Sequence, residues 1–307
     1  MRRYAGGSED RQSAGWARWL GLAVCVAGLR AEAAPKPDRT RKSAAEENQA
    51  AIVLPAKGKI DPDQGTVEAV FKLAYSVGDQ MGSGSSKRLF SLLRVCDREG
   101  NRGSRSGDGG VDFDLCLSQY TGNDHILLSF SKIEVITQYG KAVRYTAAAL
   151  PKSLKADTWH TLAVTWAQSN TSHYAFAFYL DGVCIRRHSM PIRELTRNAG
   201  VRHDDLLMIG YPGQMYGSLE SLRISKRVRD AAEIAAADKA GLTADAETLL
   251  LLDAAAIGSL KGVRNSDALK PEKGKALRVP AGGAVFGTLR SVPGRTGKAV
   301  QFRSVLP

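Results

Sequence analysis

The stretch TWHTLAVTWAQSNTSHYAFAFYLDGVCIRR, residues 158–187, decides the fold of this chain. Residues 159–166 and 174–180 alternate between two faces, which is the period of a β-strand with one buried face. Asp181-Gly182 then supplies two residues that accept the positive φ angles of a type I′ turn, and residues 183–187 form the returning strand. The stretch therefore predicts an antiparallel sheet with one buried and one solvated face.

The same pattern recurs along most of the chain, with turn residues between the runs. We expect strands at residues 51–54, 65–73, 89–95, 111–117, 125–130, 133–137, 143–149, 206–209, 218–224 and 248–252. Short strands separated by turn signals, with almost no helix, predict an all-β, antiparallel two-sheet sandwich. We expect residues 51–54 to be an edge strand because Pro55 follows. We expect residues 248–252 to be fully buried because they do not alternate.

One short helix is predicted near residues 230–240. Asp230 is suited to cap its first turn, and Glu233 stands three residues later, where it completes a capping box. Ile234 supplies an apolar contact, and Gly241 provides a suitable end.

Charge and hydrophobicity divide the chain into segments. The formal net charge is +12, and residues 254–307 hold ten Lys and Arg against two acids, so the basic character belongs to this tail. A basic tail can attract acidic glycans, envelope phosphate or nucleic acid, or it can be a solvated segment without a partner. Nothing in the sequence indicates a specific nucleic-acid site.

The N-terminus has the features of an export signal. Arginines precede an apolar run at residues 19–29, and Ala31-Glu32-Ala33 has the small residues that a signal peptidase recognises. We therefore expect a signal peptide at residues 1–33, a polar linker at 34–50, and a secreted, periplasmic or cell-surface protein. No later segment is long and apolar enough to anchor the mature chain in a membrane.

The mature chain would contain three cysteines, which leaves at least one unpaired. Cys96 and Cys116 fall on neighbouring predicted strands, so they either form a bridge or pack as small apolar residues, as Cys184 can. The spacing matches no zinc-binding pattern.

Six motifs in order resemble one known family. They are GTVEAVFKL (65–73), LFSLL (89–93), DTWHTLAVTW (157–166), FYLDGVCI (178–185), LLMIG (206–210) and YGSLESLRISKRVRDAAEI (216–234). Over about residues 50–253 the chain is similar to laminin-G-like jelly-roll domains of the concanavalin A-like lectin/glucanase superfamily. The resemblance implies a jelly-roll sandwich, with structural roles for the signature residues Trp159, His160, Asp181, Gly182 and Glu220. Trp159 and Trp166 differ in parity, so they should face opposite sides of their strand.

The C-terminal region resembles strands that open a domain of the same family, at residues 248–253 and 294–302. These residues either close the sandwich in permuted order or begin a second, truncated repeat. The low apolar content of residues 254–293 favours the second alternative.

Catalytic patterns are missing from the sequence. Glycoside hydrolases need a pair of carboxylates on one face; Asp112 and Asp114 share a face, but we expect them on a solvated outer surface. There is no Gly-x-Ser-x-Gly motif and no phosphate-binding loop. We therefore expect no enzyme activity.

Candidate binding residues come from the loops. The resemblance implies a possible calcium ion, for which Asp124, Asp204 and Asp205 are candidates. The tyrosines predicted in or beside loops could stack on sugar rings, and these are Tyr120, Tyr139, Tyr211 and Tyr216.

Three functional hypotheses follow from these observations. The first is an exported, non-catalytic binding module that recognises carbohydrate, either a polysaccharide or a glycoprotein, at the cell surface. The second is a structural or protein-interaction domain of a multi-domain surface protein. The third is a divergent glycoside hydrolase, which would need two carboxylates about 5–9.5 Å apart.

Overall fold

The structure is a computed structural model of the chain. It describes residues 50–77, 87–96, 113–120, 123–130, 135–136, 142–143, 145–151, 154–192, 200–210, 216–263 and 279–302. The predicted signal peptide and linker lie outside the described residues, apart from Ala50. None of the described helices has the length and apolar character of a membrane-spanning segment.

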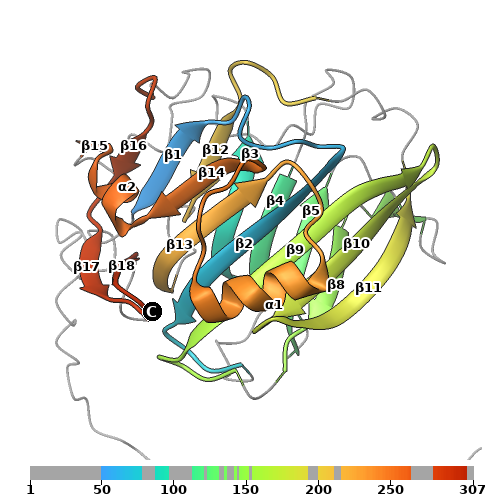
Figure 1. The fold of residues 1–307 in the computed structure, drawn as a ribbon, viewed down its shortest axis with the longest axis horizontal. Helices are drawn as coiled ribbons and strands as arrows, with labels where there is room; N and C mark the ends of the chain where they lie inside the picture. The colour runs from blue at the N-terminus through green and yellow to red at the C-terminus, as the bar shows by residue number, and fades with distance from the viewer. Residues whose placement is uncertain are drawn as a thin grey trace, which may run out of the picture. The chain divides into compact units, whose positions relative to one another are not determined.

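Two large sheets form the fold (Figure 1). The first sheet has the order β15 (Lys261–Val263), β16 (Ala284–Phe286), β1 (Ala51–Pro55), β12 (Leu206–Ile209), β3 (Lys87–Cys96), β4 (Phe113–Tyr120), β5 (Asn123–Phe130) and β8 (Tyr145–Ala149). The second has the order β11 (Val183–Pro191), β10 (His173–Leu180), β9 (Trp159–Asn170), β2 (Gln64–Leu73), β13 (Gly217–Ser225), β18 (Lys298–Gln301) and β17 (Arg290–Pro293), and β14 (Thr248–Asp253) also pairs with β13. A small third sheet joins β6 (Val135–Ile136) to β7 (Ala142–Val143).

The predicted fold class is confirmed: the chain forms an antiparallel two-sheet sandwich of the jelly-roll type. Neighbouring strands run antiparallel throughout both large sheets, except for β15 and β16, which pair in parallel. The alternating strands turn one set of side chains into a single core between the sheets. Its largest fully buried side chains include Trp166, Tyr174 and Phe71.

The hairpin from β10 to β11 turns as the sequence predicts. Asp181 and Gly182 have φ angles of 49° and 75°, which places both in the left-handed region that a type I′ turn requires. The Asp181 carboxylate accepts a hydrogen bond from the Thr161 backbone N–H at 2.9 Å and lies 2.8 Å from His160 Nδ1. These contacts tie the turn to the first residues of β9, so the signature residues His160 and Asp181 hold the hairpin in place.

The two tryptophans of β9 face opposite sides, as their parity predicts. Trp166 is completely buried in the core, and its Nε1–H donates to the carbonyl of Asp61 at 3.0 Å. Trp159 is half-buried on the other face, with Lys72 Nζ 5.5 Å from its ring centroid.

The predicted helix is α1 (Ala231–Ala240), which lies against the outer face of the second sheet (Figure 1). The capping box between Asp230 and Glu233 is present, and Gly241 is the C-cap. Ile234 packs against Ala163, Ala177 and Tyr179 of β9 and β10. A second short helix, α2 (Ala254–Gly258), was not expected; Asp253 caps it by accepting a hydrogen bond from Ala256 N–H at 2.8 Å.

Two strand predictions are wrong, one about the position of a strand in its sheet and one about the burial of a strand. β1 is an interior strand because the C-terminal β16 pairs along its outer side, opposite β12. β14 is a half-buried strand, in which Leu252 is the buried member of its apolar run. It pairs along β13, and the apolar run is half-buried because the strand lies at the rim of the second sheet.

The expectation of a solvated position at Asp114 is also wrong. Its side chain is fully buried and forms an ion pair with Arg94, with Arg94 Nη2 3.1 Å from Asp114 Oδ2. Asp112 lies outside the described residues. Asp114 is on the outer face of its sheet, and it can be buried there because the Arg94 guanidinium balances its charge.

Cys96 and Cys116 are not bridged. Cys116 lies opposite Ser91, whereas Cys96 lies five residues further along β3, about 17 Å away at the rise of a strand. A disulfide needs Cα atoms within about 7 Å of each other. The register of β3 against β4 therefore keeps the two thiols apart.

The C-terminal residues complete both sheets. β16 extends the first sheet beside β1, and β18 pairs with β13 through Ser218–Gln301 and Leu219–Val300. Val300 and Phe302 are buried in the common core. Of the two alternatives for the tail, the structure contains the one in which these residues close the sandwich, because a few well-placed apolar side chains suffice to anchor the strands.

Candidate binding sites

Of the four tyrosines proposed as sugar platforms, Tyr216 is the one whose side chain the structure describes. Tyr216 is 8% exposed and packs in the core, so its ring is not available for stacking. Tyr139, Tyr211 and the side chain of Tyr120 lie outside the described residues.

The calcium candidates are also dispersed. Asp205 accepts a hydrogen bond from Arg202 N–H at 2.7 Å within the turn before β12, and Asp204 contacts His203 at 3.9 Å. Asp124 is buried on β5, which lies three strands away from β12 in the first sheet. Among the described residues, no group of three or more His, Cys, Asp or Glu is arranged to hold a metal ion. The described structure therefore does not bring Asp124 together with Asp204 and Asp205.

A shallow groove of 620 Å³ lies on the outer face of the second sheet, beside the start of α1. We call it the alanine trough because alanines of β9 and β10 form its floor. The cross-strand register sets out two rows of side chains: Ala167, Ala175 and Ser189 in one row, and Thr165, Ala177 and Arg187 in the other. Both central positions, on β10, are alanines. Larger side chains there would fill the groove, so its existence follows from the small residues at these two positions.

One end of the trough carries a stacked pair. The Arg187 guanidinium lies 6.0 Å from the ring centroid of Tyr179, and Arg187 Nη2 donates to the Tyr179 hydroxyl at 3.3 Å. Arg187 Nε also donates to Cys184 Sγ at 3.3 Å. These hydrogen bonds, the one to Cys184 first, raise the pKa of Arg187 above its already high value. The trough therefore has a permanent, positioned cation at this end.

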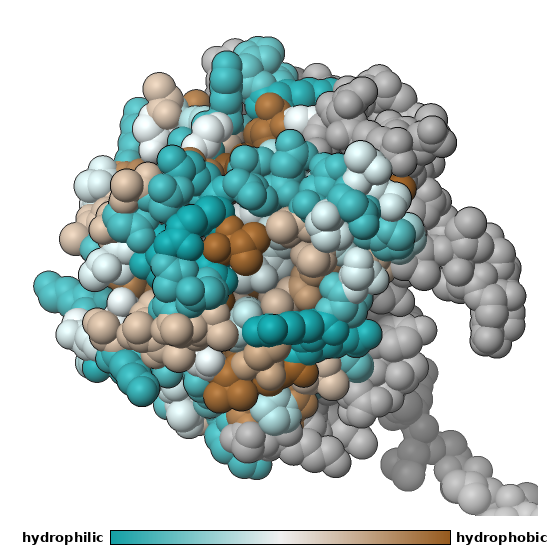
Figure 2. Space-filling view, turned by 45° about the vertical axis from the view of Figure 1, so that its right-hand side comes forward, coloured by the Kyte–Doolittle hydropathy of each residue, from teal (hydrophilic) through white to brown (hydrophobic). Residues whose placement is uncertain are grey.

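The trough also offers hydroxyl groups. Thr165 and Ser189 line it and make no hydrogen bond through their side chains within the described part of the chain. On the α1 side the wall contains Val228, whose side chain is 39% exposed. Figure 2 shows this side of the molecule, where hydrophilic surface surrounds a hollow with apolar and weakly polar residues. The combination of small, apolar and hydrogen-bonding groups is what a polar ligand with apolar faces needs.

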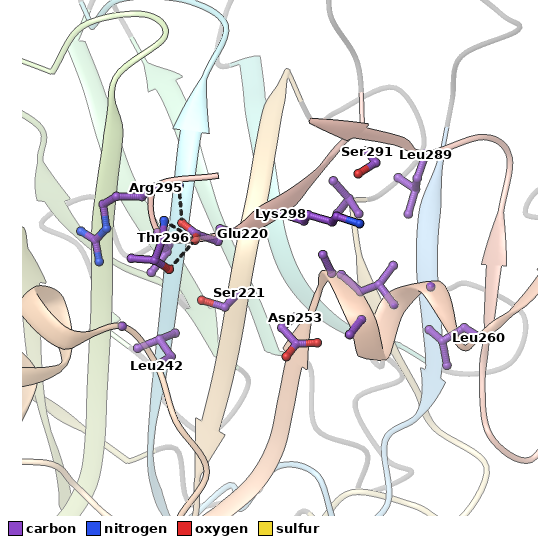
Figure 3. Close-up of a pocket in the computed structure, with 18 of the residues that line it drawn as sticks. Glu220, Ser221, Leu242, Asp253, Leu260, Leu289, Ser291, Arg295, Thr296 and Lys298 are labelled. Carbon is purple, nitrogen blue, oxygen red and sulfur yellow. Dashed lines mark hydrogen bonds between the residues drawn. The ribbon is translucent and has the colours of Figure 1, made fainter. Parts of the chain in front are cut away.

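A second cavity, of 830 Å³, lies where the C-terminal strands meet β13 and β14, and we call it the edge pocket (Figure 3). The carboxylate of Glu220 faces it and accepts three hydrogen bonds, from Arg295 N–H at 2.9 Å, from Thr296 N–H at 2.8 Å and from the Thr296 hydroxyl at 2.7 Å. Glu220 thus fastens the turn between β17 and β18 to β13. This gives the acid of the signature motif a structural role.

Most charged groups around the edge pocket already have partners. The Arg295 guanidinium contacts Asp238 Oδ1 at 3.1 Å and the Asp238 carbonyl at 2.6 Å, and the Asp253 carboxylate caps α2. Lys298 makes no ion pair or hydrogen bond within the described residues. The hydroxyl of Ser221 likewise has no partner there, although Ser221 is only 7% exposed.

Sequence reasoning missed both sites. The trough had a visible signal, because in YAFAF (residues 174–178) large residues alternate with alanines, and the alanines are on the outer face. The edge pocket had no such signal in the sequence. It requires the C-terminal hairpin to pair with β13, which is a contact between residues far apart in the sequence.

Comparisons with known proteins identify no family. No protein-family model matches the sequence, and no curated protein matches it. The heptameric SAP-like pentraxin from Limulus polyphemus aligns with 11% identity over 62% of this chain and 82% of its own, with a TM-score of 0.37. Scytalido-glutamic peptidase aligns with 8% identity over 84% and 98% of the two chains, with a TM-score of 0.31. The alginate lyase Aly36B, bound to an alginate tetrasaccharide, aligns with 10% identity over 59% and 71%, with a TM-score of 0.26. Likeness at this level leaves the function to be argued from the sites.

Proposed function

We propose that this protein is an exported, non-catalytic carbohydrate-binding module, and that the alanine trough holds a segment of a polysaccharide or of a glycoprotein glycan. The observation that carries the proposal is the pair of alanines, Ala175 and Ala177, flanked across the sheet by Thr165, Ser189 and Arg187. The small residues keep an open channel across three strands, about 10 Å from β9 to β11.

The chemistry of the lining suits a sugar chain. Sugars present apolar C–H faces and many hydroxyls, so they match a floor of methyl groups with hydrogen-bonding groups at its sides. Thr165 and Ser189 can donate and accept, and Arg187 donates in a fixed plane. The guanidinium also favours glycans that carry carboxylate or sulfate groups.

The residues that line the trough include few groups that could catalyse hydrolysis. Asp230 is the one carboxylate among the described residues that line the trough, and its side chain accepts a hydrogen bond from Glu233 N–H at 2.8 Å as the cap of α1. Hydrolysis of a glycosidic bond ordinarily needs two carboxylates facing each other across the bond. This supports binding without cleavage.

The test is a glycan array, followed by calorimetry of the purified protein with the glycans that bind. In the Ala175→Trp variant, at an exposed position of the floor, the indole fills the trough, and we expect binding to fall at least about tenfold, a loss of about 1.4 kcal/mol. The control is Ala236→Trp, at an exposed position of α1 that does not line the trough, which should bind as the unmodified protein does.

Two results would overturn the proposal. One is that no carbohydrate on the array binds, which would leave the structural or protein-interaction role. The other is that Ala175→Trp, folded by circular dichroism, binds the same glycan with unchanged affinity.

A further inference from the structure

The edge pocket has the features of a second, independent ligand site. We propose that it binds a small amphipathic carboxylate, such as a medium-chain organic acid. Its volume of 830 Å³ is in the range of small-molecule sites, and all of its lining residues belong to the described part of the chain. The site does not depend on the trough, with which it shares no lining residue.

The C-terminal hairpin supplies the polar end of the pocket. Ser291 lies opposite Val300, and Lys298 lies opposite Pro293, so Ser291, Lys298 and Val300 are on the same face of the hairpin. Figure 3 shows Lys298 extending toward the side of the pocket where Ser291 and Leu289 lie. An ammonium and a hydroxyl that point the same way form a recognition site for a carboxylate.

Among the charged groups that line the pocket, Lys298 is the one without an ion pair or hydrogen bond to another described residue. The Glu220 carboxylate is satisfied by three donors, the Asp253 carboxylate accepts a backbone hydrogen of α2, and Arg295 is paired with Asp238. Lys298 has no partner within the described residues. An anionic group placed beside its ammonium therefore gains an ion pair without displacing an existing one.

The hydroxyl of Ser221 is a further hydrogen-bonding group in the wall of the pocket. Ser221 is 93% buried on β13, lines the pocket, and has no hydrogen-bond partner among the described residues. A ligand oxygen that accepts from Ser221 gains a hydrogen bond without displacing one within the described part of the protein.

Apolar side chains form the rest of the wall. Leu242 lies at one side of the pocket, and Leu260 and Leu289 lie at the other (Figure 3). No aromatic residue is present among the described lining residues, so a sugar ring would find no stacking surface. Apolar walls with a cation at one end fit an acid with an aliphatic tail.

The experiment measures binding of octanoate to the full chain by calorimetry and by NMR chemical-shift changes. Acetate tests the charge without the tail, and octanamide tests the tail without the charge. We expect octanoate to bind at least about tenfold more tightly than either, a difference of about 1.4 kcal/mol. Lys298→Met should remove most of this advantage, whereas Lys239→Met, at an exposed position of α1 outside the pocket, should not.

The outcomes separate this site from the trough. The Ala175→Trp variant should bind octanoate normally even though its trough is filled. Octanoate that fails to bind, that binds the Lys298→Met variant equally well, or that binds no better than octanamide would overturn the proposal. Any of these results would leave carbohydrate binding at the trough untouched.

Discussion

Arg223 and Glu68 are cross-strand partners on the outer face of the second sheet, joined by two hydrogen bonds. Arg223 Nε donates to Glu68 Oε2 at 2.7 Å, and Arg223 Nη2 donates to Glu68 Oε1 at 2.8 Å. Both side chains are buried, with 5% and 1% exposed. Burial raises the pKa of Glu68, and the Arg223 guanidinium acts in the opposite direction. Arg229, 3.4 Å from Glu68, adds a second cation.

The first prediction concerns this pair. Arg223→Met should lower the free energy of unfolding by about 3–5 kcal/mol, because it leaves a buried carboxylate without its main partner. The double variant Glu68→Met/Arg223→Met should lose clearly less stability than Arg223→Met, because it removes both charges of the pair. Urea unfolding of the two variants checks this, and additive losses in a cycle with Glu68→Met would contradict it.

The second prediction concerns the close approach of β13 to β2 at Gly217. A Cβ atom at this position would lie 2.1 Å from the carbonyl oxygen of Lys72 and 2.9 Å from the ring of Phe90. Gly217→Ala should therefore destabilise the protein by about 3 kcal/mol, because backbone must move. Gly200→Ala is the matched control, as a Cβ there meets nothing within 4 Å. Thermal unfolding that is equal for both variants would rule out the close approach.

The third prediction concerns pH. Arg229 Nη2 donates to both oxygens of Asp245, at 2.8 and 2.7 Å, and these hydrogen bonds lower the pKa of Asp245 to about 2. A carboxyl whose folded pKa is lowered contributes stability above its ordinary value of 3.8, and this contribution is lost as the pH falls through about 2. Because Asp245 is partly exposed, we expect its ionised form to contribute about 1 kcal/mol to the free energy of unfolding.

The measurement compares the unmodified protein with Asp245→Asn across pH. The difference in unfolding free energy should be constant near neutral pH, shrink below pH 4 and vanish near pH 2. As a control, Asp157→Asn removes an ion pair with Lys72 whose Asp157 side chain is 80% exposed, and should cost less than about 0.5 kcal/mol. A difference that persists unchanged at pH 2 would contradict the proposed ionic origin.

The fourth prediction concerns Glu220 and the C-terminal hairpin. Glu220→Ala removes the acceptor of the hydrogen bonds from Arg295 and Thr296, so the turn between β17 and β18 should open locally more often. Amide hydrogen exchange at residues 290–301 should become about tenfold faster or more, while exchange in β9 and β10 stays slow. Equal acceleration throughout the second sheet would show instead a loss of global stability.

The alternating strands, the Asp-Gly turn and the capped helix could be predicted because each depends on residues close in sequence. Residues 159–166 and 174–180 have a period of two, and the capping box joins Asp230 to Glu233, three residues later. The opposite orientation of Trp159 and Trp166 follows from the same period. In each case the sequence separation is short, so the local pattern contains the whole signal.

The errors arise where a distant segment decides the environment. β1 is an interior strand because residues 284–286 pair along its outer side. Asp114 can be buried because it forms an ion pair with Arg94 on the neighbouring strand. The burial of Tyr216 has a similar cause, because the sequence around it is typical of a loop, yet the core encloses its ring. The alanine trough depends on outward-facing alanines, and the edge pocket depends on a C-terminal hairpin. Neither feature corresponds to a known sequence motif.

The closing strands at the C-terminus also affect how the protein is made. Strands β1 and β13 pair with residues 284–286 and 300–301, which a ribosome synthesises after both of these strands. Until those residues emerge, the nascent chain has two strands with unsatisfied backbone edges, which can pair with another chain. Native pairing along these two strands is therefore delayed until residues 284–301 have been synthesised, and a holding chaperone would be most useful during this interval.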